Sequence, residues 1–285
     1  MNLDVAFLVA DLDKAAIRTW QRVFHGPSMG MALREESITD ENLFRIAREH
    51  PALVCRKFTS REEPLNGADW EWWIGSDDEG WIALRIQAKK LVNMRYDELR
   101  YKAASAERVQ CRVLVEETER EAHGRAVYPF YCFYNGWDHS GGWPDGIPWT
   151  IGCSKPANCR TVPDVRVFGC ALAPAHEVLE IIDSSTTPLE ASGVLPHERP
   201  WSWIFANKGR SNAVDLTTIH ENVQRQRGER EPGDPLDELP NYASAVRAQW
   251  RPNALREVAP FVPCTYVAVT DLATMLVDAE IRRDR

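Results

Sequence analysis

Residues 62–90 carry the pattern that most constrains how this chain can fold, EEPLNGADWEWWIGSDDEGWIALRIQAKK. Two runs of mostly apolar residues flank a short acidic segment, residues 75–80, which has glycine at both ends. Successive side chains of a strand point to opposite faces, and glycine with aspartate favours tight turns. The pattern therefore predicts two short strands joined as a β-hairpin.

One face of each predicted strand is polar. Asp69 and Glu71 share a face of the first strand, and Arg85, Gln87 and Lys89 share a face of the second. If these two faces coincide, carboxylates meet an amide and an ammonium group across the hairpin. Carboxylate and amide oxygens are ligands that hard divalent cations prefer, and an ammonium group binds phosphate. We therefore expect a site for a divalent metal ion and a phosphate.

The remainder of the chain predicts a mixed α/β sheet packed by helices. Apolar residues at helical spacing predict helices in residues 12–24, 37–51, 96–123, 173–182 and 242–250. Apolar runs and alternation predict further strands in residues 52–58, 127–134, 165–170 and 262–269. The charged segment 222–240 contains proline and glycine and is expected to be an exposed loop.

Composition limits the class of protein. With 285 residues, 44% of them hydrophobic, and eleven Trp, the chain can bury a sizeable core. We expect a core with its N-terminal helix in residues 1–183 and an extension in residues 184–285 that packs on the core or completes it. No apolar run approaches the roughly 18 residues that cross a bilayer, and the N-terminus has no secretory pattern. Seven irregularly spaced Cys favour reduced thiols and a cytoplasmic location.

Charge is unevenly distributed along the chain. The net charge of −8 argues against indiscriminate binding of polyanions. Residues 85–112, however, contain eight basic and three acidic residues, a net charge of +5. A basic strip beside the hairpin can hold nucleic acid; a solvated helix face explains the same charges equally well.

The residues Ala68-Asp69, followed after 17 intervening positions by Gln87-Ala88-Lys89, resemble the PD-(D/E)XK phosphodiesterase superfamily. The resemblance is closest to the branch in which Gln replaces the second acid, as in Mrr-like endonucleases and effector nucleases of bacterial anti-phage systems. It covers residues 32–135, about a third of the chain. It implies the restriction-endonuclease-like fold, a mixed central sheet flanked by helices.

The resemblance also implies roles for the three motif residues. Asp69 would bind a divalent metal, Mg²⁺ or Mn²⁺, and Gln87 would contribute its side-chain or main-chain oxygen in place of the second acid. Lys89 would orient the attacking water and stabilise charge on the scissile phosphate. The implied activity is metal-dependent hydrolysis of phosphodiester bonds in DNA, in bacterial defence.

Further positions follow from the same resemblance. The superfamily often places a metal-binding Glu on the helix before the hairpin, and Glu36 is the candidate here, with Glu63 as an alternative. Gln110, on the helix after the hairpin, would support the site. Four basic residues would contact nucleic acid: Lys90, Arg95, Arg100 and Lys102. A homodimer is compatible with this class, and no membrane partner is expected.

The sequence is also compatible with three alternative functions or sites. Loss of the second acid allows a catalytically inactive descendant that binds nucleic acid or a partner protein. A Cys-dependent hydrolase with His139 or His176 as base is a less favoured choice. Cys153, Cys159 and Cys170 with His176 have the ligand types of a zinc site, but their spacing matches no paired Cys-x₂-Cys pattern, so buried free thiols are the preferred interpretation.

Overall fold

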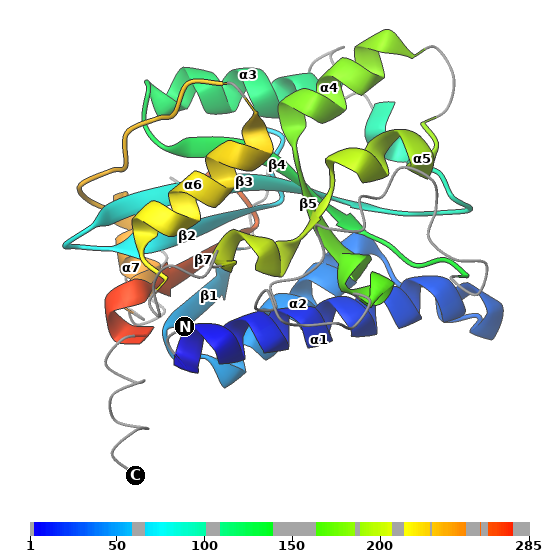
Figure 1. Cartoon of the computed structure of the whole chain (residues 1–285), viewed down its shortest axis with the longest axis horizontal. Helices are drawn as coiled ribbons and strands as arrows, with labels where there is room; N and C mark the ends of the chain where they lie inside the picture. Colours follow the sequence, from blue (N-terminus) through cyan, green and yellow to red (C-terminus); the bar gives the residue numbers. More distant parts are fainter. Residues whose placement is uncertain are drawn as a thin grey trace.

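A seven-stranded mixed sheet with helices on both faces forms the body of the protein in the computed structural model (Figure 1). The structure describes residues 3–58, 66–100, 109–138, 164–185, 189–206, 214–228, 230–248, 257 and 262–275. This architecture confirms the predicted α/β class. Within these ranges, no helix combines the length and the apolar character that crossing a membrane requires.

The strands occur in the spatial order β1-β7-β2-β3-β4-β5-β6. β2 and β7 are parallel, as are β3 and β4, and the other neighbours are antiparallel. The strand bounds are β1 Leu53–Lys57, β2 Trp70–Ser76, β3 Gly80–Lys90, β4 Val127–Tyr134, β5 Cys170–Pro174, β6 Arg199–Pro200 and β7 Tyr266–Asp271. The last strand in the sequence, β7, therefore lies inside the sheet, between β1 and the hairpin.

The helices cover the sheet in two layers. One core contains the apolar faces of α1, α2 and α6, and the other contains those of α3, α4, α5 and α7; Figure 1 shows α1 and α2 on the side of the molecule opposite to α3 and α4. The helix bounds are α1 Leu3–His25, α2 Glu35–Glu49, α3 Gln110–Ala122, α4 Ala175–Ser184, α5 Ala191–Val194, α6 Leu216–Arg227 and α7 Asn241–Arg247. Short 3₁₀ helices are η1 Pro27–Met29, η2 Asp97–Arg100, η3 Val165–Gly169, η4 Leu195–His197 and η5 Trp201–Phe205.

The predicted hairpin is present as β2 and β3. The side chains alternate as expected, because Trp70 and Trp72 belong to one core and Trp73 to the other. The polar faces coincide, since Glu71 pairs directly with Arg85. All seven residues of β2 are buried, and the strand order places this hairpin at the centre of the sheet.

Two predicted segments are corrected by the structure. Residues 165–170 were expected to form a strand, but they form the 3₁₀ helix η3, and the strand starts at Cys170. The reason is close backbone packing on α1: a Cβ atom at Gly169 would lie 1.9 Å from the carbonyl oxygen of Ala16.

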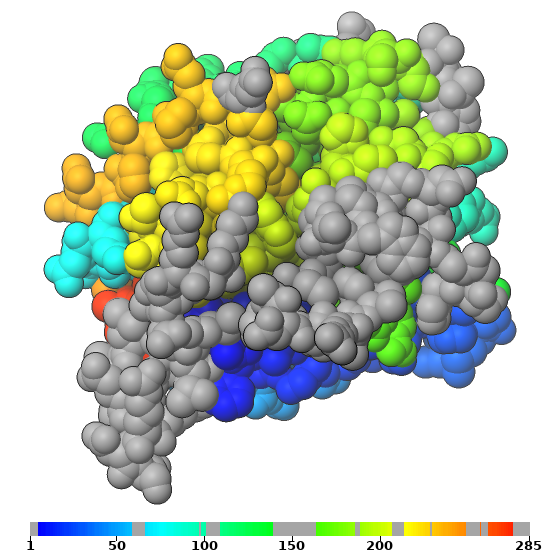
Figure 2. All heavy atoms as spheres, viewed as in Figure 1, coloured from blue at the N-terminus to red at the C-terminus, as the bar shows by residue number. Residues whose placement is uncertain are grey.

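The segment 222–240 is not a continuous loop, because its first residues belong to α6. Buried Ile219 and Val223 give this helix an apolar stripe. Asp215 caps its start by accepting a hydrogen bond of 2.8 Å from the Thr218 N–H. Figure 2 shows α6 (yellow) on the molecular surface beside the β2–β3 turn (cyan), where Glu79 accepts a hydrogen bond of 3.1 Å from the Leu216 N–H.

Candidate active site

A cavity of about 310 Å³ lies at the end of the hairpin where β2 begins and β3 ends. We call it the Asp69 cavity. It brings together five of the predicted site residues. Its lining consists of Glu35, Glu36, Thr39, Asp69, Gln87, Lys89, Glu98, Gln110, Thr265 and Tyr266. One cavity is thus lined by five predicted residues that are spread over 75 positions of the sequence: Glu36, Asp69, Gln87, Lys89 and Gln110.

Asp69 is held in place by hydrogen bonds from both neighbouring segments, the end of β3 and the residue before β7. Its Oδ2 atom accepts hydrogen bonds from the Gln87 amide at 2.6 Å and from the Ala88 N–H at 2.8 Å. Its backbone N–H donates to Ile86 and its carbonyl accepts from Thr265. Gly67, with φ +73°, starts this turn, and a Cβ there would lie 3.1 Å from the backbone nitrogen of Leu114. The turn therefore requires glycine to bring Asp69 close to α3.

Burial raises the pKa of the Asp69 carboxyl to about 6. The Ala88 N–H, the Lys89 ammonium and the Gln87 amide oppose this shift by favouring the ionised form, whereas Glu36 adds to it through repulsion. A carboxylate with a raised pKa in a cavity is a frequent feature of functional sites. A cation beside Asp69 would favour the ionised form in the same way as Lys89 does.

Gln87 and Lys89 are almost fully buried on β3, with 3% and 6% of their surfaces exposed. The Oε1 atom of Gln87 is buried without a hydrogen-bond partner among the described residues. The Lys89 ammonium lies 3.8 Å from Glu98, a longer separation than a hydrogen bond. A buried amide oxygen is costly without a partner, so the Gln87 Oε1 favours a ligand in this cavity, and the buried Lys89 ammonium lies beside it as an attractive charge for an anion.

Glu35 is a cavity residue that the sequence did not single out. Its Oε1 atom accepts a hydrogen bond of 2.7 Å from the Lys90 N–H, which joins the start of α2 to the end of β3. Burial raises the pKa of Glu35; Lys89 opposes the shift, and Glu98 and Asp69 reinforce it by repulsion. Adjacent glutamates at a helix start give no sequence signal for which one faces the sheet. Glu98, on η2, was missed for the same reason.

The donor set of the cavity fits a hard divalent cation. Mg²⁺ takes oxygen ligands and keeps several waters, so one or two carboxylates are sufficient. Asp69, the unpartnered Oε1 of Gln87 and a helix carboxylate from Glu36 or Glu35 supply oxygens of this kind. In the described ranges, no group of three or more His, Cys, Asp or Glu side chains is arranged to hold a metal ion. Any cation here would therefore rely on the Gln87 oxygen and on water in addition to these carboxylates.

The four basic residues predicted to contact nucleic acid differ in their exposure and hydrogen bonding. Lys90 donates from Nζ to the Leu33 carbonyl at 2.6 Å, and Arg100 donates to the Ser185 carbonyl. Arg95 is exposed in a turn after β3. Lys102 and the alternative metal ligand Glu63 lie outside the residues that the structure describes. Lys90 and Arg100 thus already donate to backbone carbonyls, so fewer side chains of the predicted basic strip are free to contact nucleic acid.

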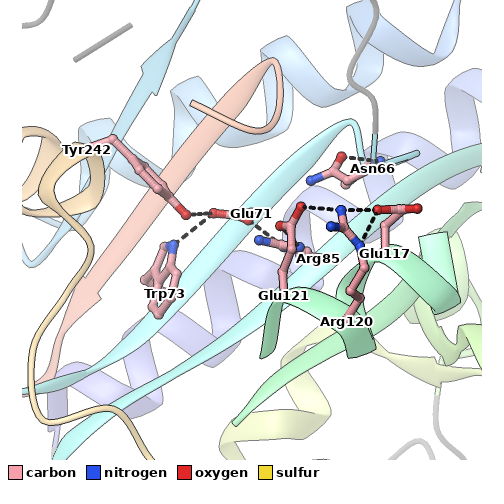
Figure 3. A network of polar contacts seen from close by, with 9 residues as sticks. Asn66, Glu71, Trp73, Arg85, Glu117, Arg120, Glu121 and Tyr242 are labelled. Atoms are coloured by element: carbon pink, nitrogen blue, oxygen red, sulfur yellow. Dashed lines mark hydrogen bonds and ion pairs between the residues drawn. The ribbon is translucent and has the colours of Figure 1, made fainter. Parts of the chain in front are cut away.

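Glu71 and Arg85, on the polar face of the hairpin, lie apart from the Asp69 cavity in a closed network (Figure 3). Arg85 forms ion pairs of 2.7 Å with Glu71 and 2.6 Å with Glu121. Glu71 also accepts hydrogen bonds from Tyr242 at 2.7 Å and from Trp73 at 3.0 Å. These contacts use both carboxylate oxygens of Glu71, which therefore fixes α7 and α3 to the sheet instead of serving a ligand.

Four of the five described cysteines are buried thiols in different parts of the core, and Cys55 is partly buried. Cys55, Cys111, Cys132, Cys170 and Cys264 are free, and burial raises the pKa of Cys170 to about 12. Cys170 contacts Thr19 and Asn42, whereas His176 contacts Glu119 at 2.7 Å. Both therefore have partners other than each other. Cys153, Cys159 and His139 lie outside the described residues. A protonated buried thiol is a poor nucleophile.

Comparison with known families gives one match that covers nearly the whole chain. A family model described as "Family of unknown function (DUF6615)" matches residues 8–278. No curated protein matches the sequence. The matched range includes α1, the hairpin, the cavity residues and β7, so one family pattern covers both the sheet and its C-terminal strand.

Proposed function

The chain belongs to this family, DUF6615, and we propose that it is a divalent-cation-dependent nuclease that hydrolyses phosphodiester bonds in DNA. The observation that carries the proposal is the convergence of Asp69, Gln87 and Lys89 in one cavity at the end of the hairpin. Their arrangement supports the resemblance to the PD-(D/E)XK superfamily, in which the corresponding positions bind the metal and the phosphate.

The charge balance of the cavity supports dependence on a cation. Four carboxylates line it, those of Glu35, Glu36, Asp69 and Glu98, together with the single ammonium of Lys89. Such a set repels a phosphodiester unless positive charge is added. A bound divalent cation would supply that charge, and it would also lower the pKa of a coordinated water molecule.

The residues of this chain have distinct tasks in the proposed reaction. Asp69 and Gln87 would hold the cation through their oxygens, and the hydrogen bond between them fixes both side chains. Lys89, buried beside them, stabilises the negative charge that develops on the phosphate oxygens. Gln110 lines the opposite wall from α3 and limits the space open to water and substrate.

Cleavage assays with matched variants test the proposal. Plasmid, linear duplex and single-stranded DNA are incubated with the protein in Mg²⁺ or Mn²⁺, and Asp69→Asn and Lys89→Met are compared with wild type. Asp183→Asn is the control, because Asp183 is an exposed residue that pairs with Arg112 outside the cavity. We expect cleavage by wild type and the control and its loss in the two site variants. Equal cleavage by all four proteins would exclude these residues as the active site.

A second candidate function is a non-catalytic protein of the same fold that binds nucleic acid or a partner protein. It is favoured by Gln87, whose amide group occupies one oxygen of Asp69 at 2.6 Å, and by the net charge of −8. Calorimetric titration with Mn²⁺ separates the two candidates. Absence of cation binding, together with DNA binding that weakens as salt increases, would favour the non-catalytic protein.

A further inference from the structure

A second cavity, of about 530 Å³, lies beside the Asp69 cavity. We call it the Trp137 cavity. It lies between the segment after α1, the end of β3 and the end of β4, and most of its lining is apolar or aromatic. The lining consists of Arg22, Val23, Phe24, Pro27, Ala32, Leu33, Ile38, Lys90, Leu91, Val92, Asn93, Met94, Gly136, Trp137 and Asp138. Its volume is in the range of about 300–1,000 Å³ that small-molecule sites occupy.

The two cavities are separated by one layer of residues. On β3, Lys89 lines the Asp69 cavity and the next residue, Lys90, lines the Trp137 cavity. In α2 and the segment before it, Glu35 lines the first cavity and Leu33 the second. Lys90 connects the two sides, because its N–H binds Glu35 and its Nζ binds the Leu33 carbonyl. Since successive residues of a strand point to opposite faces, a nucleotide with its phosphate at Lys89 reaches the Trp137 cavity around the end of β3 and the start of α2, which line both cavities.

The turn that closes this cavity is conformationally unusual. Asn93 and Met94 have φ values of 50° and 59°, and Val92 and Arg95 exchange backbone hydrogen bonds of 3.0 and 2.9 Å across them. A two-residue turn with both φ values positive favours Gly at its second position, which Met94 occupies. Non-glycine residues with positive φ are strained and concentrate at functional sites. Met94 adds an apolar side chain to the cavity wall.

The chemistry of the lining fits a nucleobase. Phe24 lines the cavity with an aromatic ring, and bases stack on such side chains without sequence preference. Trp137 is 6% exposed and packs its ring against Trp20, with the ring centroids 4.0 Å apart. The indole N–H of Trp137 is a donor without a partner in the part of the chain that the structure describes, and nucleobases carry carbonyl and ring-nitrogen acceptors. Lys90 and Arg22 add positive charge at the wall, although Arg22 also pairs with Glu41.

We propose that the Trp137 cavity binds an unpaired nucleobase next to the scissile phosphate, so that the substrate is single-stranded DNA or DNA with an unpaired nucleotide. This inference rests on the proposed nuclease function. A base within a duplex has both faces covered by its neighbours, so only an unstacked base can enter a cavity of this kind. The Asp69 cavity then holds the phosphate, and the Trp137 cavity selects the unpaired state.

Binding of thymidine 5′-monophosphate tests the inference without requiring cleavage. Saturation-transfer NMR is recorded with millimolar nucleotide, and 2′-deoxyribose 5-phosphate serves as the ligand without a base. We expect transfer to the thymine protons and weaker binding of the sugar phosphate by at least tenfold. Equal binding of the two ligands, or absence of transfer to the base, would overturn the inference.

Variants locate the contact. Ala32→Trp fills the cavity from an exposed position and is expected to reduce transfer to the base at least fivefold, as is Val92→Glu. Phe44→Trp is the control, because Phe44 is 64% exposed and lines neither cavity. Base binding that Ala32→Trp and Val92→Glu both leave unchanged would overturn the inference.

Cleavage and base binding are separable outcomes. If thymidylate binds through its base and no DNA is cleaved, the inference is supported and the proposed nuclease function fails. If DNA is cleaved and duplex is cut as rapidly as single strands, with no base contact, the nuclease function stands and the inference fails. A preference of at least tenfold for single-stranded over blunt duplex DNA, lost in Ala32→Trp, supports both.

Discussion

Glu71 and Arg85 face each other across the β2–β3 hairpin, with 2.7 Å between Oε1 and Nε. Both are buried, and Glu71 has no exposed surface. This pair has two consequences. First, Glu71 lies on the same face of the hairpin as Asp69 but is already fully hydrogen-bonded, so Asp69 is the hairpin acid that remains for the cavity. Second, the charge pair joins α3 and α7 to the sheet through Glu121 and Tyr242.

Removing one member of this pair is expected to destabilise the protein strongly. Arg85→Leu leaves Glu71 as an uncompensated charge in the interior, which costs about 3–5 kcal/mol. Arg48→Ala is the control, because Arg48 is 59% exposed and pairs with Glu49 on the surface away from this network; an exposed pair contributes about 1 kcal/mol or less. Urea unfolding measures both variants. Similar midpoints for the two would show that the buried network is not a stabilising unit.

The hairpin and its polar face could be predicted because they follow from local patterns. Alternation fixes which residues share a face, and the glycines at positions 75 and 80 fix the turn, so Asp69 and Gln87 were expected to meet across it. The 2.6 Å contact between them agrees with that expectation.

Other features depend on contacts between distant segments and leave no local signal. The position of β7 between β1 and β2 depends on pairing between segments that lie about two hundred residues apart in the sequence. Thr265, the residue before β7, donates a backbone hydrogen bond to the Asp69 carbonyl. Glu35 is distinguished from Glu36 only by its bond to Lys90. The strand expected at 165–170 was wrong because close packing of Gly169 on α1 overrides apolar alternation.

Restoring the second acid tests whether Gln87 limits cation binding. Gln87→Glu places a second carboxylate against Asp69, so the variant should be less stable than wild type without a cation because like charges repel. With Mn²⁺ the added carboxylate should tighten binding about tenfold or more, and the shift in melting temperature on adding Mn²⁺ should increase. Calorimetry and thermal melting measure the two effects.

Gln110→Glu is the matched control for this substitution, since Gln110 lines the same cavity from the start of α3. A carboxylate at position 110 would not replace the group that is hydrogen-bonded to Asp69. It should therefore change Mn²⁺ affinity less than Gln87→Glu does. If both variants bind Mn²⁺ as weakly as wild type, position 87 does not contribute to a cation site.

Lys89→Met should separate catalysis from cation binding. The side chain of Lys89 is 7% exposed and lies among carboxylates, so removing its positive charge should leave Mn²⁺ binding unchanged or tighter. The rate of cleavage with bound DNA should fall by a factor of roughly 100 or more, the scale of losing one group that stabilises developing charge. Single-turnover cleavage at saturating Mn²⁺ measures the effect.

The exposed Lys14, which pairs with Asp11 outside both cavities, provides the control Lys14→Met, expected to cleave at the wild-type rate. An unchanged rate in Lys89→Met, with Mn²⁺ binding lost instead, would assign this lysine to the cation site's structure and not to the chemical step.

Glu198 gives the protein a pH-dependent stability that is independent of the cavity. It is fully buried and contacts Tyr96 at 2.8 Å and Asn135 at 2.6 Å. Burial raises the pKa of Glu198 to about 8, with the Tyr96 and Asn135 hydrogen bonds opposing the shift. The Tyr96 hydroxyl also lies 2.6 Å from the Asn135 carbonyl oxygen. One hydroxyl proton cannot serve both acceptors, so a protonated Glu198 that donates to Tyr96 satisfies the whole set.

The sign of the effect follows from proton linkage. Between the ordinary pKa of 4.5 and the folded value of about 8, the folded protein holds a proton that the unfolded chain has lost. The free energy of unfolding therefore falls as pH rises through this window. Glu198→Gln keeps the hydrogen bonds, because its amide can donate to Tyr96 and its oxygen can accept from Asn135, and it removes the titration. At pH 7 the variant should be more stable than wild type by about 3 kcal/mol. Urea unfolding from pH 5 to pH 8 measures this: the difference between the two proteins should grow with pH, and parallel profiles would show that Glu198 is ionised in the folded state or titrates outside the window.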